Sequence, residues 1–305
     1  MRIVVTGASG FIGSALVRAL CARGDEVHAV VRRLPRPDEV GIDLARRRLD
    51  TSQMKGGSLE GIDAAVHLAG APITGRWTAK RLEEVRSSRV ALGDLLARSL
   101  ASLQVPPAVL VSGSAVGIYG DRGDEVLDEQ SAQGTGVLAD LCRSWEASAL
   151  AAQERAIRVV TIRTGIVLGG TRGAEGGILK AEAPIFRLGL GARLGEGRQW
   201  TSWVSLDDEV AVILRAIDDP GLVGPVNVTS PNPVRNIELT NALAQVFGRH
   251  ARLAVPARVL RLGLGSGAAN ELLLASQRVL PNKLTDAGYV HVHPELAGAL
   301  AAAFG

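Results

Sequence analysis

Three glycines near the start of the chain have the spacing of a nucleotide-binding turn. They are Gly7, Gly10 and Gly13, between an apolar run at residues 3–6 and a segment with helical spacing at residues 11–23. In such a turn the first glycine permits the sharp bend, the second lets a pyrophosphate approach the backbone, and the third lets the helix lie close to the sheet. The helix also points free N–H groups and the positive end of its dipole at the phosphates. The pattern therefore predicts a dinucleotide site, and the alternative is a turn of this shape that binds no nucleotide.

The end of the second expected strand predicts which dinucleotide is bound. A site for NAD(H) usually has Asp or Glu there, which binds the ribose 2′-hydroxyl. In this chain Val30 and Val31 are followed by Arg32 and Arg33, with no acidic residue. A guanidinium binds phosphate through paired hydrogen bonds and keeps its charge. We therefore expect NADP(H), with its 2′-phosphate on Arg32. The alternative is that both arginines are solvated surface charges.

The elements that must position these residues alternate between strand and helix. Strand-like apolar runs lie at residues 3–6, 26–31, 64–68, 108–112 and 158–162, and helical spacing occurs at residues 11–23, 80–103 and 138–156. This alternation predicts an α/β protein with a Rossmann-type, doubly wound parallel sheet. Hydrophobic residues make up 47% of the chain, which suits a sheet buried on both faces.

The last third of the chain has a different character. Glycine-rich stretches lie at residues 169–177 and 189–197, a further strand at 226–228, and helical segments at 237–247, 256–264 and 270–279. These patterns predict a smaller, mainly helical C-terminal substrate lobe. We assign residues 1–168 and 205–230 to the cofactor-binding domain, and residues 169–204 and 231–305 to this second lobe.

Composition narrows the class of protein. The formal net charge is +3 and no basic stripe is interleaved with aromatics, so no nucleic-acid partner is expected. The two cysteines, Cys21 and Cys142, form no CxxC pair, so neither a zinc ribbon nor a redox dithiol is expected. The chain starts on an expected strand and has no bilayer-spanning apolar run. We therefore expect a cytoplasmic protein with no membrane partner.

Further motifs follow in one order along the chain. They are His67-Leu68-Ala69-Gly70-Ala71-Pro72-Ile73, Arg76-Trp77-Thr78, Ser88-Arg89-Val90, Ser114-Ala115-Val116-Gly117-Ile118-Tyr119-Gly120, Trp145-Glu146, Arg163-Thr164-Gly165-Ile166-Val167-Leu168-Gly169, Trp203-Val204 with Asp207-Asp208, Gly224-Pro225-Val226-Asn227 and Gln277-Arg278-Val279 before Pro281. With the glycine turn, they make the chain resemble the atypical extended short-chain dehydrogenases/reductases, in the branch of epimerase-family proteins with a small C-terminal domain of unknown function.

The resemblance implies a Rossmann domain that holds NADP(H) along the ends of its strands. The cofactor contacts that it implies are Gly7, Gly10, Phe11, Ile12, Gly13, Arg32, Leu68, Ala69, Glu84, Arg89 and Val167. A buried Arg89 beside the phosphates is electrostatically reasonable, and the alternative is a surface charge on a helix.

The usual family mechanism uses a Ser, a Tyr and a Lys, in which Tyr exchanges a proton with the substrate oxygen and Lys lowers the Tyr pKa. Glu146 fits the position four residues after the Lys, so the resemblance puts Cys142 at the Lys position and Leu138 at the Tyr position. Neither side chain can perform the usual role. Ser114 fits the Ser position, and we expect it to be catalytic.

The missing proton donor has several candidates. Tyr119 follows Ser114 and is a candidate catalytic residue, although a packing aromatic is the favoured interpretation. Asp128 and Glu129 provide carboxylates that are more often part of a solvated loop. Cys142 is reactive only if an arginine lowers its pKa, and a buried inert thiol is the favoured interpretation.

The remaining candidates lie in the second half of the chain. Trp200 and Trp203 either form the wall of a substrate pocket or pack the lobes together. His291 and His293 alternate on a short segment, but no third ligand is apparent, so no metal site is expected. One of the aspartates Asp207 and Asp208 is expected to cap the helix that follows.

Two functions remain open from the sequence. The first is an NADP(H)-dependent oxidoreductase or epimerase that acts on a small carbonyl or sugar-like substrate near Ser114. The second is a non-catalytic NADP(H)-binding regulatory or scaffold protein, which the missing Tyr and Lys favour. The resemblance also implies a homodimer, with the helices at residues 80–103 and 138–156 as its interface elements.

Overall fold

One large sheet is the centre of the computed structural model, which describes residues 1–170 and 177–304. Its strands are β1 (Arg2–Thr6), β2 (Glu26–Val31), β3 (Val40–Asp43), β4 (Arg48–Asp50), β5 (Ala64–His67), β6 (Val109–Ala115), β8 (Arg158–Thr164) and β13 (Gly224–Val228). They lie in the order β13-β8-β6-β5-β1-β2-β3-β4, and neighbouring strands are parallel except for the pair of β3 and β4. The order reverses between β1 and β5, which is where doubly wound sheets bind ligands. The structure thus has the Rossmann-type fold that the sequence predicts.

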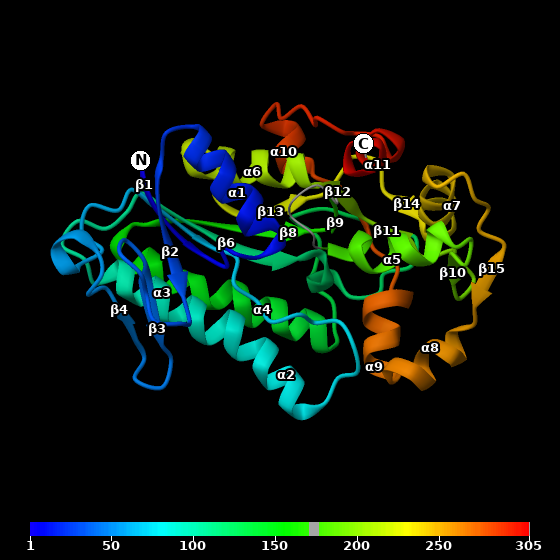
Figure 1. Cartoon of the computed structure of the whole chain (residues 1–305), viewed down its shortest axis with the longest axis horizontal. Helices are drawn as coiled ribbons and strands as arrows, with labels where there is room; N and C mark the ends of the chain where they lie inside the picture. Colours follow the sequence, from blue (N-terminus) through cyan, green and yellow to red (C-terminus); the bar gives the residue numbers. More distant parts are fainter. Residues whose placement is uncertain (171–176, 305) are drawn as a thin grey trace.

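Helices cover both faces of this sheet (Figure 1). One face carries α1 (Phe11–Ala22), α6 (Leu206–Asp218) and α10 (Asn282–Asp286), and the other carries α3 (Leu92–Ala101) and α4 (Val137–Ala149). Strand β1 shows why both faces need a cover: Ile3 and Val5 pack in the core beneath α1 and α6, whereas Val4 packs beneath α3 and α4. Burial on both faces explains the nearly continuous apolar runs of these strands.

The helix expected at residues 80–103 is interrupted. It consists of α2 (Ala79–Arg86), a π-helical turn (Ser87–Ala91) and α3. A π-turn accommodates one extra residue and changes the direction in which its side chains point. Arg89 lies in the middle of this turn. The helix expected at residues 138–156 likewise ends early, since α4 is followed by a 3₁₀ turn (Leu150–Arg155).

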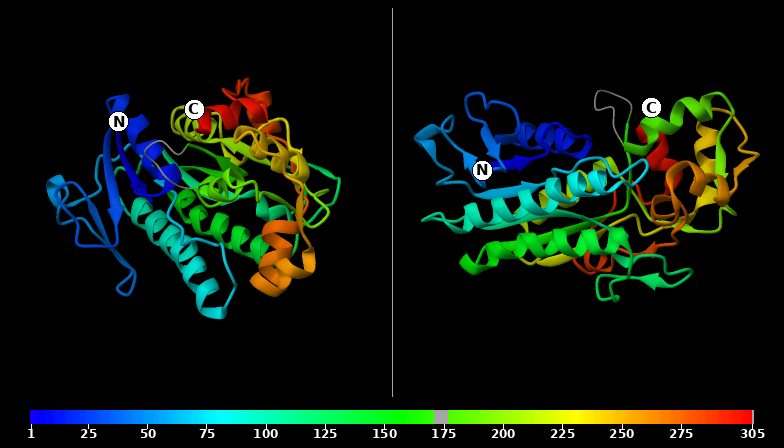
Figure 2. Two further views of the ribbon diagram at one scale, coloured as in Figure 1. Left: turned by 45° about the vertical axis from the view of Figure 1, so that its right-hand side comes forward. Right: turned by 90° about the horizontal axis from the view of Figure 1, so that it is seen from below.

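A second, smaller lobe packs beside the sheet domain (Figure 2). It contains α5 (Gly177–Arg187), α7 (Asn236–Val246), α8 (Ala257–Leu264), α9 (Ser266–Ala268) and α11 (Leu296–Phe304), with the strand pairs β10 (Ala192–Leu194) and β15 (Leu253–Val255), and β11 (Trp200–Thr201) and β14 (Val234–Arg235). Its core is formed by apolar side chains of α5, α7 and α11 together with Trp203.

Two short strand pairs connect the lobes. They are β9 (Ile166–Leu168) with β12 (Trp203–Ser205), and β7 (Val126–Leu127) with β16 (Arg278–Val279). The helix expected at residues 270–279 is instead a π-helical turn (Ala269–Leu274) followed by β16. Leu284 of α10 then packs in the core of the sheet domain, so this part of the segment 231–305 belongs with the sheet.

Part of the expected glycine-rich stretch, at residues 171–176, lies outside the described residues. No helix within residues 1–170 and 177–304 combines the length and the apolar character needed to cross a membrane.

Candidate cofactor and substrate site

The glycine turn forms a cradle at the switch point between β1 and β5. Gly7 has a φ of +74°, a conformation that favours glycine. A Cβ on Gly13 would lie 2.0 Å from the carbonyl oxygen of Gly7, so α1 can start this close to the strand only without a side chain there. Gly10 precedes α1 and provides no side-chain cap, which leaves the first-turn amides open to a ligand. These features fit the pyrophosphate of a dinucleotide.

The residues after β5 line this cradle. A Cβ on Gly7 would lie 2.7 Å from the carbonyl carbon of Leu68 and 2.8 Å from the amide nitrogen of Ala69, so both residues touch the turn. The ring of Phe11 packs against Gly169, which follows β9: a Cβ on Gly169 would lie 2.6 Å from this ring. The start of α1 therefore meets both the end of β5 and the segment that leads into the second lobe.

The structure distinguishes the two arginines after β2. Arg33 donates to both carboxylate oxygens of Glu39, at 2.7 Å and 2.5 Å. Arg32 is exposed and makes no hydrogen bond or ion pair within the described part of the chain. Arg32 is therefore the guanidinium that is available to a phosphate on this edge of the site.

Other expected cofactor contacts are less closely grouped. Ile12 is partly buried against the core of the sheet domain, and Val167 of β9 packs there as well. Glu84 is exposed on α2 and lies 3.4 Å from Arg81 Nη1.

Arg89 lies at the carboxyl end of β5. Its Nη1 donates to the carbonyl of Ala71 at 2.8 Å, and its guanidinium carbon lies 5.0 Å from the ring centroid of Trp145. A Cβ on Gly70 would lie 2.8 Å from this guanidinium carbon, so glycine makes room for it. Burial lowers the pKa of Arg89, but an arginine keeps its charge at neutral pH. Among the described residues this cation has no carboxylate partner.

The buried residue His67 fixes the backbone of Arg89. The Nδ1 atom of His67 lies 2.7 Å from the hydroxyl of Thr6, and its Nε2 atom lies 2.9 Å from the carbonyl oxygen of Arg89. Because a carbonyl only accepts, Nε2 of His67 must carry the proton. Burial lowers the pKa of His67 to about 4, so the ring is neutral. The end of β1 and the π-turn are thus linked through one side chain.

A cavity of about 270 Å³ lies between the carboxyl ends of β6 and β8 and the second lobe. Ala115, Val116 and Gly117 line it after β6, and Thr164 and Gly165 line it after β8. Helices α4, α5 and α7 contribute mainly apolar side chains. The titratable residues of its wall, within the described ranges, are Arg89, Cys142, Glu182 and Glu271.

The positions that the family resemblance assigns to Tyr and Lys face this cavity. Leu138 and Cys142 lie one turn apart on α4 and both line the wall. Burial raises the pKa of the Cys142 thiol to about 12, so it is neutral at physiological pH. Both positions therefore line the cavity, but these two residues provide neither a proton donor nor a cation.

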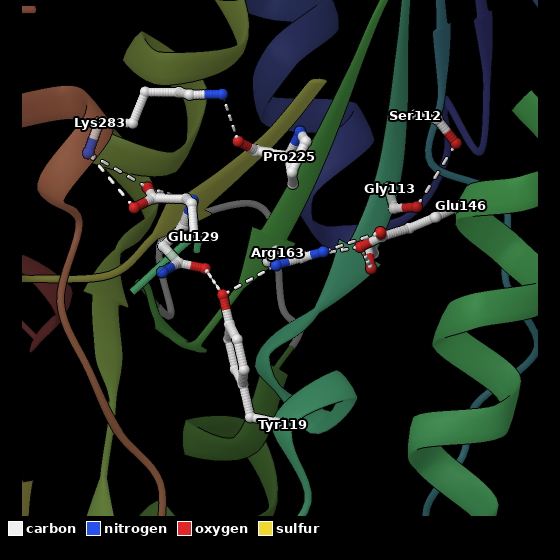
Figure 3. Close-up of polar contacts among 10 residues, drawn as sticks. Ser112, Gly113, Tyr119, Glu129, Glu146, Arg163, Pro225 and Lys283 are labelled. Atoms are coloured by element: carbon white, nitrogen blue, oxygen red, sulfur yellow. Dashed lines mark hydrogen bonds and ion pairs between the residues drawn. The ribbon is translucent and has the colours of Figure 1, made fainter. Parts of the chain in front are cut away.

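Ser114 and Tyr119 belong to a buried polar network outside the cavity wall. The hydroxyl of Ser114 donates to Glu146 at 2.8 Å, and Glu146 pairs with Arg163. Arg163 also donates to the hydroxyl of Tyr119 at 3.0 Å, and this hydroxyl donates to Asn227 at 2.7 Å (Figure 3).

The network commits both expected catalytic hydroxyls to protein partners. Tyr119 is 0% exposed, and burial raises its pKa despite the neighbouring Arg163. Neither Tyr119 nor Ser114 lines the cavity. These contacts fit the favoured interpretation of Tyr119 as a packing aromatic, because its ring is buried and its hydroxyl is bound between Arg163 and Asn227.

The two tryptophans have different surroundings. Trp200 lines the cavity, and the guanidinium carbons of Arg235 and Arg278 lie 4.1 Å and 4.5 Å from its ring centroid. Trp203 is 0% exposed, and its indole nitrogen donates to the carbonyl of Asn232. Trp203 thus packs in the second-lobe core and does not line the cavity.

The remaining sequence candidates have structural partners. Glu129 accepts from the amides of Asn227 and Lys283, and Asp128 accepts within its own turn. His291 contacts the carbonyl of Thr229, and His293 contacts Asp207. No cluster of three or more metal-ligating side chains occurs in the residues that the structure describes.

The cap of α6 differs from the expectation. Ser205, not an aspartate, caps this helix, and Asp208 accepts hydrogen bonds from the segment at residues 289–293.

Two cavity residues escaped the sequence interpretation. Glu271 reaches from the second lobe and accepts from the amides of Val137 and Leu138, at 3.1 Å and 2.8 Å. A carboxylate is favourable at this start of α4, which has no side-chain cap of its own. Glu182 lies on α5 and lines the opposite part of the wall. The sequence pattern that could have revealed Glu182 is a single acidic residue between Ile178 and Phe186 on one face of the helix.

Comparison with known proteins agrees with this geometry. The model of the NAD dependent epimerase/dehydratase family matches residues 3–228, and that of the domain of unknown function DUF1731 matches residues 255–303. An epimerase family protein of Mycobacterium tuberculosis is 40% identical over 299 residues, covering 98% of this chain and 96% of that protein. The human epimerase family protein SDR39U1 is 33% identical over 304 residues, covering 98% of both.

Solved structures show the same relationship. The crystal structure of human SDR39U1 (isoform 2) with NADPH has a TM-score of 0.87 to this chain, with 32% identity and 98% of both chains covered. MoeE5 in complex with UDP-glucose and NAD has a TM-score of 0.73 and covers 99% of this chain and 97% of that chain, but at 21% identity the likeness concerns the fold alone. The chain belongs to the NAD dependent epimerase/dehydratase family, as an epimerase family protein with a C-terminal DUF1731 domain.

Proposed function

We propose that the chain is an NADP(H)-dependent oxidoreductase or epimerase that acts on a small carbonyl or sugar-like substrate in the cavity between its lobes. The observation that carries the proposal is the position of this cavity. It lies at the carboxyl ends of β6 and β8, on the same edge of the sheet as the glycine cradle. The NADPH in the human relative's crystal structure supports the choice of cofactor.

Residues of this chain would hold the cofactor mainly through its phosphates. The glycine cradle would bind the pyrophosphate, and Arg32 would bind the 2′-phosphate that distinguishes NADPH from NADH. Arg89 would provide a second cation at the end of β5. This cation would be needed because Cys142 occupies the position of the usual Lys on α4. Bound NADPH would supply a hydride, which is chemistry that the protein itself does not have to provide.

A second function has a specific observation in its favour. Leu138 cannot exchange a proton, and the hydroxyls of Ser114 and Tyr119 are committed to Glu146 and Asn227. These contacts favour a protein that binds NADP(H) as a structural or regulatory ligand without turnover.

Turnover distinguishes the two functions. The purified chain is incubated with NADPH and a panel of aldehydes, ketones and sugar derivatives, and the loss of nicotinamide absorbance is followed. We expect oxidation of NADPH with part of the panel, above the rate of a sample without protein. Tight NADPH binding without turnover across the panel would contradict the enzymatic function and support the non-catalytic one.

A further inference from the structure

One face of helix α5 contributes a single acidic group to the cavity. Ile178, Glu182 and Phe186 are spaced four residues apart, so they lie on one face of the helix, and all three line the wall. The same helix starts at Gly177, where a Cβ would lie 2.8 Å from the ring of Phe11 in the glycine turn. Glu182 therefore lies on an element that runs from the cofactor cradle along the cavity.

Glu182 differs from the other titratable residues of the wall. Arg89 donates to backbone carbonyls, Glu271 accepts from the start of α4, and Cys142 has contacts with the end of β6. Glu182 makes no hydrogen bond or ion pair with any described residue. A partly buried carboxyl without a partner is costly unless something enters the cavity to meet it.

The surroundings of Glu182 favour the protonated form of its carboxyl. Burial alone raises the pKa of this carboxyl to about 7. The elements packed against α5 add no compensating charge: β9 has no titratable residue, and Glu238 of α7 is exposed and bound to the amide of Arg235. Arg89 and Glu271 are the charged groups elsewhere in the wall. A carboxyl that changes charge near pH 7 can both give and take a proton.

We infer that Glu182 is the catalytic acid and base of this site, which takes the place of the missing tyrosine. This inference rests on the proposed enzymatic function. In the reducing direction, bound NADPH would supply a hydride to the carbonyl carbon of the substrate, and the C=O π-electron pair would move to the oxygen. Glu182 would give its proton to that oxygen, so that the carbonyl would become an alcohol, NADPH would become NADP⁺ and Glu182 would become a carboxylate that solvent reprotonates.

The cavity wall also indicates the class of substrate. The cavity has a volume of about 270 Å³. This volume is small compared with the roughly 300–1,000 Å³ of most ligand pockets. Its wall is mainly apolar, and Arg89 is the cation that lines it among the described residues. A nucleotide sugar carries a diphosphate that a single arginine matches poorly. The substrate that fits is a small aldehyde or ketone with an apolar body.

Three variants test the inference through activity. NADPH oxidation is followed with benzaldehyde, hexanal and cyclohexanone, and with UDP-glucose as the polar comparison. Glu182→Gln removes the proton and is expected to lower kcat roughly 100-fold or more while the Kd for NADPH stays unchanged. Glu182→Asp keeps the acid and is expected to retain more activity. Glu196→Gln, an exposed acid in the same lobe, is the matched control and is expected to behave as the wild-type chain.

A second readout does not depend on turnover. Carbon-13 labelling of glutamate side chains allows each carboxyl to be titrated by NMR. The resonance that disappears in Glu182→Gln is expected to have its midpoint near pH 7. In the active chain kcat for reduction is expected to fall above this pH, as the acid form is lost, and Glu182→Gln is expected to lose that dependence.

The outcomes separate the two proposals. An active wild-type chain with an equally active Glu182→Gln variant would overturn the role of Glu182 alone. A midpoint below pH 5 for the Glu182 resonance would do the same. A wild-type chain that binds NADPH but reduces no carbonyl compound would overturn the proposed function, and the role of Glu182 with it. Faster turnover of UDP-glucose than of the apolar carbonyl compounds would overturn the substrate class.

Discussion

Replacement of Arg32 by alanine provides the sharpest test of the cofactor site. The guanidinium of Arg32 is exposed and has no partner in the described residues, so alanine removes no internal contact and the fold is expected to be unaffected. Hydrogen bonds to a charged group contribute about 1.5–3 kcal/mol. This corresponds to an increase of about 10- to 150-fold in the Kd for NADPH. NADH lacks the 2′-phosphate, so its Kd is expected to stay the same.

The neighbouring arginine is a matched control for the same charge. Arg33 is held by both oxygens of Glu39, so Arg33→Ala is expected to leave the Kd for NADPH nearly unchanged. Both variants are titrated with NADPH and NADH by nicotinamide fluorescence at one fixed salt concentration, because screening changes all such affinities. Equal NADPH affinity of Arg32→Ala and the wild-type chain would refute the assignment. So would an equal loss of affinity for both cofactors.

Two further substitutions test the packing and electrostatics of the sheet domain. Gly13→Ala would place a Cβ 2.0 Å from the carbonyl oxygen of Gly7, so fluorescence titration is expected to show loss of NADPH binding. The control Gly263→Ala, with no atom near its Cβ position, is expected to bind NADPH as the wild-type chain does. Normal NADPH binding by Gly13→Ala would contradict the close approach of α1 to the strand. Glu209 is 0% exposed, and burial raises its pKa to about 8. Because the carboxyl pKa of Glu209 is higher in the folded chain than in the unfolded chain, ionisation of this group destabilises the fold, and the cost grows as pH rises above the unfolded pKa. By pH 9 this cost is about 5 kcal/mol. Urea unfolding is therefore expected to show a growing stability advantage of Glu209→Gln between pH 5 and pH 9, and a constant difference would refute this electrostatic explanation.

Much of the sheet domain was predictable because its signals are local. The apolar runs at residues 3–6 and 64–68 are buried on both faces, so their composition alone indicates parallel strands. The glycine spacing was equally informative, since the steric limits at Gly7 and Gly13 arise within one turn of the chain. The π-turn around Arg89 was missed because its residues have ordinary helical composition.

The cavity could not be predicted, because it is assembled from segments far apart in the sequence. Trp200 and Trp203 are only three positions apart, but they belong to different strands, β11 and β12, and one lines the cavity while the other packs in the second-lobe core. Likewise Arg32 and Arg33 look equivalent until Glu39 is found to bind one of them. The environment of Glu182 depends on the packing of α5 against β9 and α7, which no local pattern reports. A homodimer through α3 and α4 stays a prediction.

The central claim is that this chain is built to hold a 2′-phosphorylated nicotinamide dinucleotide. The most direct measurement is isothermal titration of the unmodified chain with NADPH and, separately, with NADH under identical conditions. We expect one site per chain and a Kd for NADPH at least about tenfold lower than that for NADH, from the contact of Arg32 with the 2′-phosphate. Equal affinities, or no binding of either dinucleotide, would contradict the account.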